Sequence, residues 1–554
     1  MTRAGHALLL ARTVRHLRPA QVVHRARLRA QKQVLHRWPG VPERRWRRPV
    51  SGEPGWPLSF APLLLKMPSD PERAEQIARG TFSFLGHTRS VAAPTDWSRP
   101  EASQLWRYNL HYFEWAAALA TRGGHASAQD AFLRLWRSWQ QGARFGRWDE
   151  WSPYVVSVRA WSLAAVFDSL VRGTEIESDV VKSLESHAGF VLRNLELDVG
   201  GNHLLKNLKA LVGLGVFLGD DDLVDRARGM IEREVGVQVL ADGGHFERSP
   251  SYHCQVLGDL IDVVGLLRAT GREDLDSVDH AIARMRAWLG AMLLPDGDVP
   301  LFNDAELVGR PRIVLLEPTP AADETLTVLG DSGYVVARPS SRIHLVADVG
   351  QPCPPDLPAH AHADCLSFEL CVDGTRLVVD TGTSTYAPGT RRQFERSTAA
   401  HNTVGIDGAD QTEVWGTFRA ARRAVPRLEA ASESDGVLVV VASHDGYQRL
   451  PGRPLHRRRW EVRAAAVTIE DTVSGAGVHE VVARVHLAPG TSVSRDGRTV
   501  RAGPMNISCN QELDLADAMV ATAHGHALHA TCVVARSKAQ LPIRVVTTLD
   551  LPDP

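Results

Sequence analysis

The chain has 554 residues, of which 44% are hydrophobic and 23% are charged, and its formal net charge is -1. This length allows two or three domains that each bury a core, and the near-neutral charge gives no global electrostatic case for nucleic-acid binding. The six cysteines form no CxxC pair, which argues against a zinc knuckle, a redox motif or a disulfide framework. No apolar run reaches transmembrane length.

Residues 1–50 carry thirteen Lys or Arg and a single acid, Glu43. Apolar residues recur among these arginines at roughly helical spacing, which predicts a basic helical arm over 1–60. Two interpretations stay open: a helix packed on the body, or an arm that touches a membrane surface or an anionic polymer. The apolar run 7–11 is too short for a signal-peptide core. We therefore expect a cytoplasmic protein, with a periplasmic or secreted location by an unconventional route as the alternative.

Residues 61–320 show helical periodicity throughout. The apolar positions predict amphipathic helices, which we place at 126–141, 204–218, 223–240, 256–267 and 281–293. Connections contain Gly, Pro and Asp, and no strand-like alternation interrupts them. This part is predicted to be all-α.

From residue 321 the period changes to that of β-strands. Short alternating segments bounded by Gly and Asp predict strands, for example at 332–338, 342–348, 376–380, 437–442 and 480–485. Helices first and strands afterwards indicate an α+β multidomain chain, with an antiparallel β-sandwich over 321–554.

The segment 360–370 places His360, His362 and Asp364 at every second position before an alternating apolar run. If it is a strand, these three side chains share one face. A solvated strand end, or histidines bonded to structural carbonyls, is the plain alternative.

Polar residues elsewhere in the β half add to this group. His362, Asp380 and His401 form a ligand set that suits a zinc-like site, although strand-end histidines and a turn aspartate explain them equally well. Tyr386 closely follows Asp380 in the sequence, and Arg396 adds positive charge.

In the helical half, Asn202 and His203 open a predicted helix. Asn202 could be the helix cap, or the pair could bind a carboxylate at the positive end of the helix dipole. Tyr252 lies just before another helix, where it is either a half-buried aromatic or a functional hydroxyl.

Further polar and aromatic residues at helix starts suggest a cleft lined for sugar, although core packing would explain the aromatics equally well. We assign substrate binding to His111, Trp151, Tyr154, Arg159, Arg396 and Trp415.

These motifs together resemble the heparinase II/III-type polysaccharide lyases. The resemblance covers about 100–480 and is strongest at 360–370, 377–382 and 401–408, with 201–203 and 249–252 in the helical half. It implies an N-terminal incomplete (α/α) toroid followed by an antiparallel β-sandwich.

The resemblance also implies β-elimination of a uronic-acid polysaccharide. The polymer would be glycosaminoglycan-like (heparan sulfate, hyaluronan or chondroitin type) or a bacterial exopolysaccharide. In the family's pattern Asn202 and His203 neutralise the substrate carboxylate, and His360 is a further active-site histidine. Tyr252 is the acid for the leaving oxygen and a candidate base, and Tyr386 is the alternative base.

The family's metal positions map to His362, Asp380 and His401. They imply one divalent ion, with zinc first and manganese or calcium as alternatives, that orders the site more than it acts as a Lewis acid. Other readings are a glycoside hydrolase on the same toroid, or a non-catalytic glycan-binding component of exopolysaccharide assembly. The sequence leaves the oligomeric state open.

Overall fold

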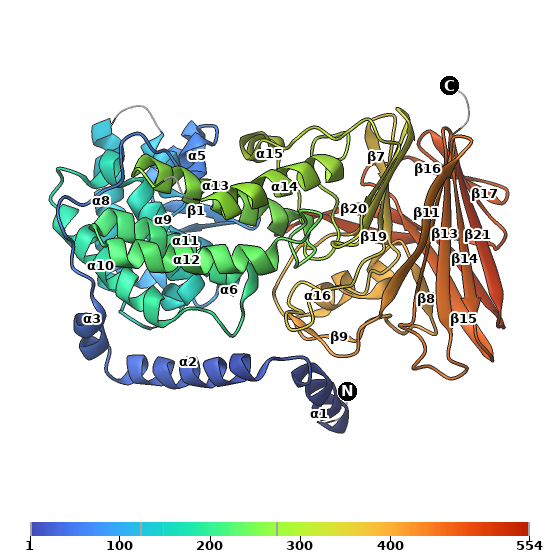
Figure 1. The fold of residues 1–554 in the computed structure, drawn as a ribbon, viewed down its shortest axis with the longest axis horizontal. Coiled ribbons are helices and arrows are strands. Elements are labelled where there is room, and N and C mark those ends of the chain that lie inside the picture. The colour runs from blue at the N-terminus through green and yellow to red at the C-terminus, as the bar shows by residue number, and fades with distance from the viewer. Residues whose placement is uncertain (1–2, 122–124, 148, 273–274, 552–554) are drawn as a thin grey trace. The chain divides into compact units, whose positions relative to one another are not determined.

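The computed structural model describes residues 3–121, 125–147, 149–272 and 275–551 (Figure 1). Contacts divide the chain into two compact units. The helical unit comprises Arg18–Gln238 and Gln255–Ile282, and the β unit comprises Met1–Leu17, Val239–Cys254 and Ala283–Pro554.

The helical unit is the incomplete (α/α) toroid. Its helices are α2 (Pro19–Arg37), α3 (Gly40–Trp46), α4 (Leu63–Lys66), α5 (Pro71–Ala78), α6 (Gln104–Tyr112), α7 (Ala116–Ala120), α8 (His125–Gly142), α9 (Pro153–Ala165), α10 (Glu177–Arg193), α11 (Gly201–Leu218) and α12 (Asp221–Gln238). Helices α9 and α11 are buried on almost every face because their sequences are apolar nearly all round. The amphipathic helix α12 packs against α11.

A hairpin of β1 (Thr81–Phe84) and β2 (His87–Ser90) interrupts this unit. The all-α prediction was wrong at this point, because two four-residue strands are too short to show a measurable alternation. Helices α13 (Pro250–Ala269) and α14 (Asp276–Met292) each have residues in both units.

The β unit contains antiparallel sheets, which confirms the predicted class. One sheet has the order β3-β4-β5-β6-β7, with bounds Leu326–Leu329, Tyr334–Ser340, Ile343–Asp348, Phe368–Val372 and Thr375–Val378. A second has the order β19-β20-β15-β8, with bounds Leu513–Ala523, His526–Gln540, Val478–His486 and Val404–Ile406. The pair β9–β10 spans Val414–Trp415 and Arg419–Ala420.

The largest sheet has the order β11-β12-β13-β14-β21-β18-β17-β16. Its bounds are Pro426–Ser434, Val437–His444, Leu455–Arg463, Ala466–Ser474, Ile543–Asp550, Met505–Cys509, Thr499–Ala502 and Val493–Asp496. Strands β13 and β14 alternate strictly between buried and partly exposed residues, so Trp460 and Ile469 face the core. That core is shared with residues of the other two sheets, including Leu345 and Val481.

The β unit also holds α1 (Arg3–Val14), α15 (Arg310–Leu316) and α16 (Thr390–Glu395). The contact division therefore differs from the predicted boundaries near 60 and 320. Trp288 and Phe302 form one buried cluster with Tyr334 of β4, which ties the chain before 320 to the sheet. Helix α1 joins this unit through Thr13, whose hydroxyl accepts a hydrogen bond from Trp415 Nε1 at 3.0 Å.

Within the described ranges, we find no helix with both the length and the apolar character needed to cross a membrane.

Candidate functional site

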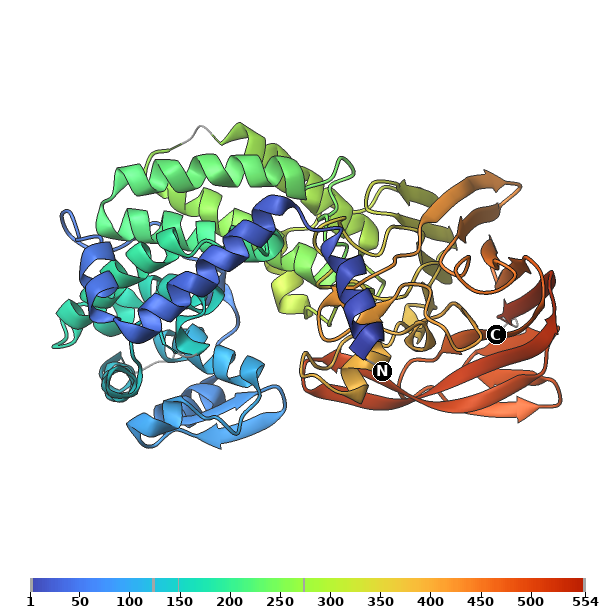
Figure 2. The ribbon, with the colours of Figure 1, turned by 90° about the horizontal axis from the view of Figure 1, so that it is seen from below.

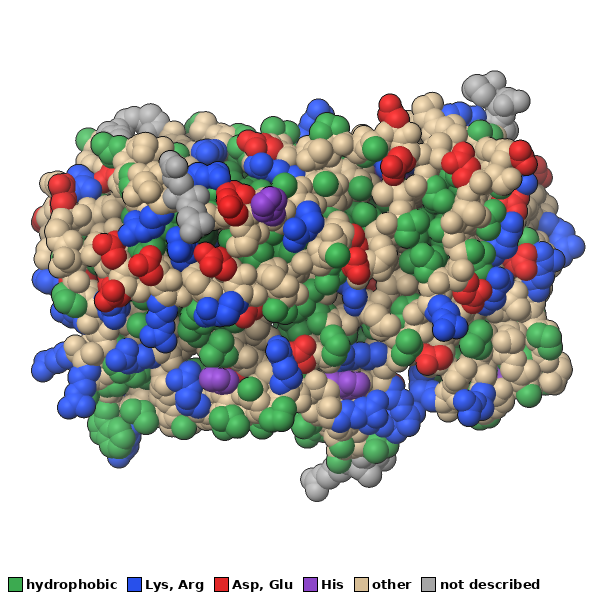
Figure 3. All heavy atoms as spheres, viewed as in Figure 1, with side chains coloured by type: hydrophobic (Ala, Val, Ile, Leu, Met, Phe, Trp, Pro, Cys, Tyr) green, Lys and Arg blue, Asp and Glu red, His purple; other side chains and the backbone are tan. Residues whose placement is uncertain are grey.

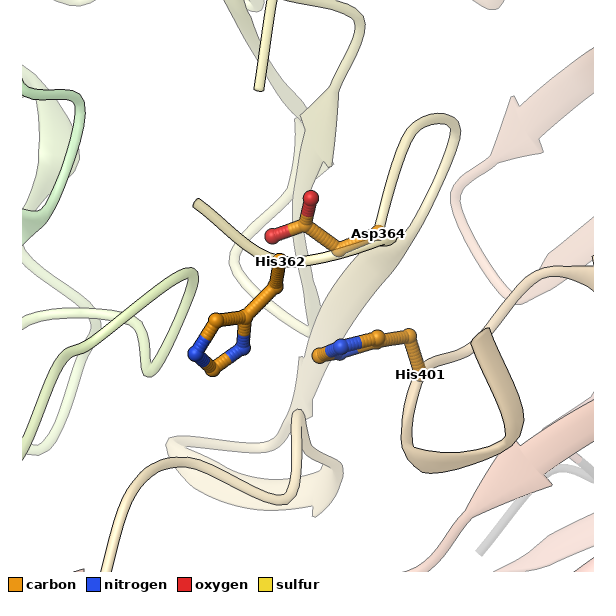
Figure 4. A group of neighbouring side chains, drawn as sticks. All are labelled: His362, Asp364 and His401. Atoms are coloured by element: carbon orange, nitrogen blue, oxygen red, sulfur yellow. The ribbon is translucent and has the colours of Figure 1, made fainter. Parts of the chain in front are cut away.

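A buried group in the β unit brings together His362, Asp364 and His401 (Figure 4). The first two lie between β5 and β6, and His401 lies just before β8. One nitrogen or oxygen from each residue lies within 4.8 Å of the others. All three side chains are 0% exposed.

The segment that carries His360, His362 and Asp364 is not a strand, so this prediction was wrong. Strand β6 begins only at Phe368, and Leu366 has a positive φ of 63° that breaks the extended chain. His362 and Asp364 nevertheless converge with His401, whereas His360 contacts Glu247 and the Tyr252 ring.

This group fits a divalent cation. His362 Nδ1, His401 Nε2 and both carboxylate oxygens of Asp364 have no hydrogen-bond partner among the described residues. Leaving buried polar atoms unpaired is costly, and here they converge from three residues. Two imidazoles and one carboxylate make a donor set that zinc accepts.

Asp380 has a position that differs from the predicted ligand role. Its Oδ2 lies 2.8 Å from His401 Nδ1, and its Oδ1 accepts a hydrogen bond from the Gly382 amide at 3.2 Å. Asp364 is therefore the carboxylate of the converging set, and Asp380 orients the His401 ring from behind. Asp304 does the same for His362, whose Nε2 lies 2.9 Å from Asp304 Oδ1.

The protonation preferences of His362 and Asp364 also suit a cation, whereas that of His401 is set by Asp380. Burial lowers the pKa of His362 to about 3, so its ring is neutral as a ligand must be. Burial raises the pKa of Asp364 to about 6, because its carboxylate has lost its hydration and has no hydrogen-bond partner among the described residues. Burial also disfavours charge on His401, but the Asp380 carboxylate outweighs it and raises the pKa of His401.

His360 lies between two carboxylates in the same unit. Its Nδ1 is 3.0 Å from Asp304 Oδ2, and its Nε2 is 3.2 Å from Glu247 Oε2. The His360 ring also packs on Tyr252, with ring centroids 4.0 Å apart. Contacts to both nitrogens and to the ring face fix the orientation of this imidazole.

Tyr252 and Tyr386 form a half-buried pair whose hydroxyl oxygens are 2.8 Å apart. The Arg392 guanidinium lies over the Tyr386 ring, 5.0 Å from its centroid. Burial of the hydroxyl, with the negative charge of Asp304 nearby, raises the pKa of Tyr386 well above its usual value. Either hydroxyl can be the donor of this hydrogen bond, but a Tyr386 hydroxyl that keeps its proton is able to donate to Tyr252, which disfavours its predicted alternative role as the base.

Asp304 connects several of these residues, and no sequence pattern predicted that. This fully buried carboxylate accepts hydrogen bonds from Arg392 Nη2 at 2.8 Å and Thr383 Oγ1 at 3.0 Å, besides its contacts with two histidines. Burial alone would raise its pKa, but Arg392 and the histidine hydrogen bonds hold the pKa well below the usual range. Asp304 is more than fifty residues from its histidine partners, so no spacing pattern connects them.

In the helical unit, Asn202 and His203 lie in the first turn of α11. The N-cap residue is Gly200, so Asn202 does not cap the helix. His203 Nδ1 is 3.0 Å from Glu196 Oε1, and its ring packs on Tyr154 at 4.5 Å between centroids. The structure therefore places the Tyr154 ring against His203 in the first turn of α11.

Other residues assigned to substrate binding are held inside their own units. Arg159 is 0% exposed, donates to the Glu150 carbonyl at 2.8 Å and contacts the Trp151 ring. His111 is also buried, and its Nδ1 accepts a hydrogen bond from Trp139 Nε1 at 3.2 Å. These contacts give Arg159 and His111 a structural role, which corrects the prediction.

The same correction applies to two residues of the β unit. Arg396 is buried and donates to the Ala361 carbonyl at 2.9 Å, so it holds the loop ahead of His362. Trp415 is bonded to Thr13 of α1 and packs edge-on against His6. Neither side chain is directed to solvent.

Comparison with known proteins finds family matches for both halves of the chain. The heparinase II/III N-terminus model matches residues 81–315, and the heparinase II/III-like C-terminal model matches 321–546. The chain is 28% identical over 512 residues to FtsZ-localized protein C of Caulobacter vibrioides, covering 85% of this chain and 86% of that protein. It is 26% identical over 318 residues to a heparin-sulfate lyase of Bacteroides stercoris, covering 49% of this chain and 46% of the lyase.

Among solved structures, heparinase III has a similar fold. The TM-score is 0.73 at 16% sequence identity, and the match covers 90% of this chain and 87% of that one. Together the two family models span most of the helical half and nearly all of the β half, on either side of residue 320. The chain therefore belongs to the heparinase II/III-like family.

Proposed function

We propose that this protein is a polysaccharide lyase that cleaves a uronic-acid polysaccharide by β-elimination. The observation that carries the proposal is the Tyr252–Tyr386 hydroxyl pair, 2.8 Å apart, with His360 packed on the Tyr252 ring. Its membership in the family, and its similarity to proteins named heparin-sulfate lyase, support the same reaction.

In a β-elimination, the C5 proton of the uronate is removed, the C4–O bond breaks, and the electron pair forms a C4=C5 double bond. The leaving oxygen then takes up a proton. We assign both proton transfers to Tyr252, which accepts the C5 proton and passes it to the leaving oxygen. In this mechanism the Tyr386 hydroxyl, 2.8 Å away, donates a hydrogen bond to the Tyr252 oxygen while that oxygen is deprotonated, and so stabilises it.

The substrate carboxylate must be neutralised before C5 becomes acidic enough to lose its proton. The family pattern assigns this task to Asn202 and His203, and that role remains a prediction. His360 supports Tyr252 by ring packing, in an orientation that Glu247 and Asp304 fix.

A divalent cation, with zinc as first choice, is proposed for the set His362, Asp364 and His401. When bound, it would compensate the buried Asp364 carboxylate and order the loop. That loop also carries His360, so the proposed role is to hold the active-site histidine in place.

The contacts of Asp304 and Glu247 argue against a glycoside hydrolase. Such an enzyme needs two carboxyl groups that flank the scissile bond. Asp304 and Glu247 both contact His360, and each is only 2% exposed. Asp304 is further engaged by Arg392. These two acids are committed to protein contacts in the described structure.

The test is incubation with a panel of uronic-acid polysaccharides, beginning with heparan sulfate, while ultraviolet absorbance of the unsaturated uronate is followed. We expect a rise with one polymer, and no turnover by Tyr252→Phe with unchanged folding. New reducing ends without new absorbance would show hydrolysis instead. Full activity of Tyr252→Phe would remove that residue from the mechanism.

A second candidate is a non-catalytic glycan-binding protein. It is favoured by the near full-length similarity to a relative whose name refers to FtsZ localization and not to a lyase. Tight binding of a polymer by the wild-type chain, with no product after prolonged incubation, would support this candidate over the lyase.

A further inference from the structure

Helix α2 of the helical unit carries apolar side chains on the face that points away from the protein. Val22, Val23 and Val34 are 48%, 67% and 46% exposed, and Trp38 and Val41 just beyond the helix are 62% and 57% exposed. Eight of the seventeen large apolar side chains exposed among the described residues lie within 8–41. Such clustering differs from the scattered single apolar residues of ordinary surfaces.

The inner face of α2 is fixed to the helical unit. Leu35 is buried, and Arg25 Nε donates to Asp198 Oδ2 at 3.1 Å. Gln31 Nε2 donates to Asn194 Oδ1 at 2.9 Å. Figure 2 shows α2 as one continuous helix along the outside of this unit. Because the inner face is held in place, Val23 and Val34, three turns apart, are presented on a fixed outer face.

Basic residues flank this apolar face. Residues 18–48 contain ten Lys or Arg and one acid, Glu43. Arg29, Lys32 and Arg37 are exposed, and no carboxylate of the described residues pairs with them. In Figure 3, Lys, Arg and hydrophobic side chains share the lower edge, where Figure 1 places α2.

We infer that the outer face of α2, together with Trp38 and Val41, docks on an anionic lipid surface. An interfacial helix combines an apolar face with flanking Lys and Arg, and tryptophan favours the headgroup region. The unpaired cations of α2 complement anionic headgroups. A soluble anionic polymer would satisfy the cations but leave the valines and Trp38 in water, so the apolar face favours lipid.

The experiment is sedimentation of the full chain with phosphatidylcholine vesicles, with and without phosphatidylglycerol. We expect binding only with phosphatidylglycerol, and weaker binding at higher salt. Both Val23→Glu/Val34→Glu and Arg29→Glu/Lys32→Glu/Arg37→Glu should weaken binding at least about tenfold. All five positions are exposed, so the melting temperature should be unchanged.

Arg226→Glu and Val237→Glu, at exposed positions on α12 of the same unit, are the matched controls and should bind vesicles like the wild type. Absence of wild-type binding to the anionic vesicles would overturn the inference, as would equal binding by the α2 variants. Light scattering that shows a dimer dissociated by Val23→Glu/Val34→Glu would assign the face to a second copy instead.

Discussion

The Tyr386 hydroxyl lies 2.8 Å from the Tyr252 hydroxyl, and the pKa of Tyr386 is raised well above its usual value. The raised pKa keeps the proton on Tyr386, so the proposed mechanism makes Tyr386 the hydrogen-bond donor of the pair and Tyr252 the residue that exchanges a proton with substrate.

Tyr386→Phe removes the donor to Tyr252 and leaves the ring in place. We expect kcat to fall by about 10- to 1,000-fold with little change in KM, because the lost hydrogen bond acts mainly on the deprotonated oxygen. The measurement is the initial rate of absorbance increase on the active polymer. The control is Tyr447→Phe, which loses a buried hydroxyl bonded to the Val404 carbonyl and should alter stability but not kcat. Unchanged turnover by Tyr386→Phe would contradict the donor role.

The metal proposal predicts about one divalent ion per purified chain, measured by elemental analysis. Chelation should lower the melting temperature, because the buried Asp364 carboxylate then loses its compensation. Asp364→Asn should abolish metal retention. Asp380→Asn should weaken it by roughly 10- to 100-fold, since Asp380 acts through His401.

The two aspartate variants also decide between the ligand sets. Equal loss of metal in both would make Asp380 a direct ligand as well. Full retention by Asp364→Asn would exclude it from the set.

Asp304→Ala leaves the buried Arg392 without its carboxylate. Removing one partner of a buried ion pair costs about 3–5 kcal/mol, so a large loss in the free energy of unfolding is expected. Asp279→Ala is the matched control, because its partner Arg268 is 52% exposed and such a pair contributes at most about 1 kcal/mol. Urea titration of the full chain measures both, and similar values for the two variants would refute the central role of Asp304.

Asn202→Ala tests the carboxylate-neutralising role. Loss of one donor to a developing oxyanion costs about 100- to 1,000-fold in kcat, and we expect a loss of this size. The control Asn194→Ala removes another buried asparagine of the helical unit, which bonds the Phe190 carbonyl, and should affect stability alone. Equal rates for Asn202→Ala and wild type would require another group to neutralise the substrate.

The sequence by itself determined the order of helices and strands and the family, because periodicity and contiguous motifs are local properties. The predicted helix at 204–218 and the strand at 437–442 correspond to α11 and β12. Local motifs also singled out Tyr252, His360 and His401 as candidate site residues, and their roles stay predictions.

Only the tertiary structure decided which side chains meet. Asp364 replaced Asp380 in the converging set because Asp380 lies behind His401, where its Oδ2 is 2.8 Å from His401 Nδ1. Asp304 reached two histidines more than fifty residues away, and Arg159 proved to be buried. Long-range pairing and burial depend on how distant segments pack, and no local pattern in the sequence encodes that.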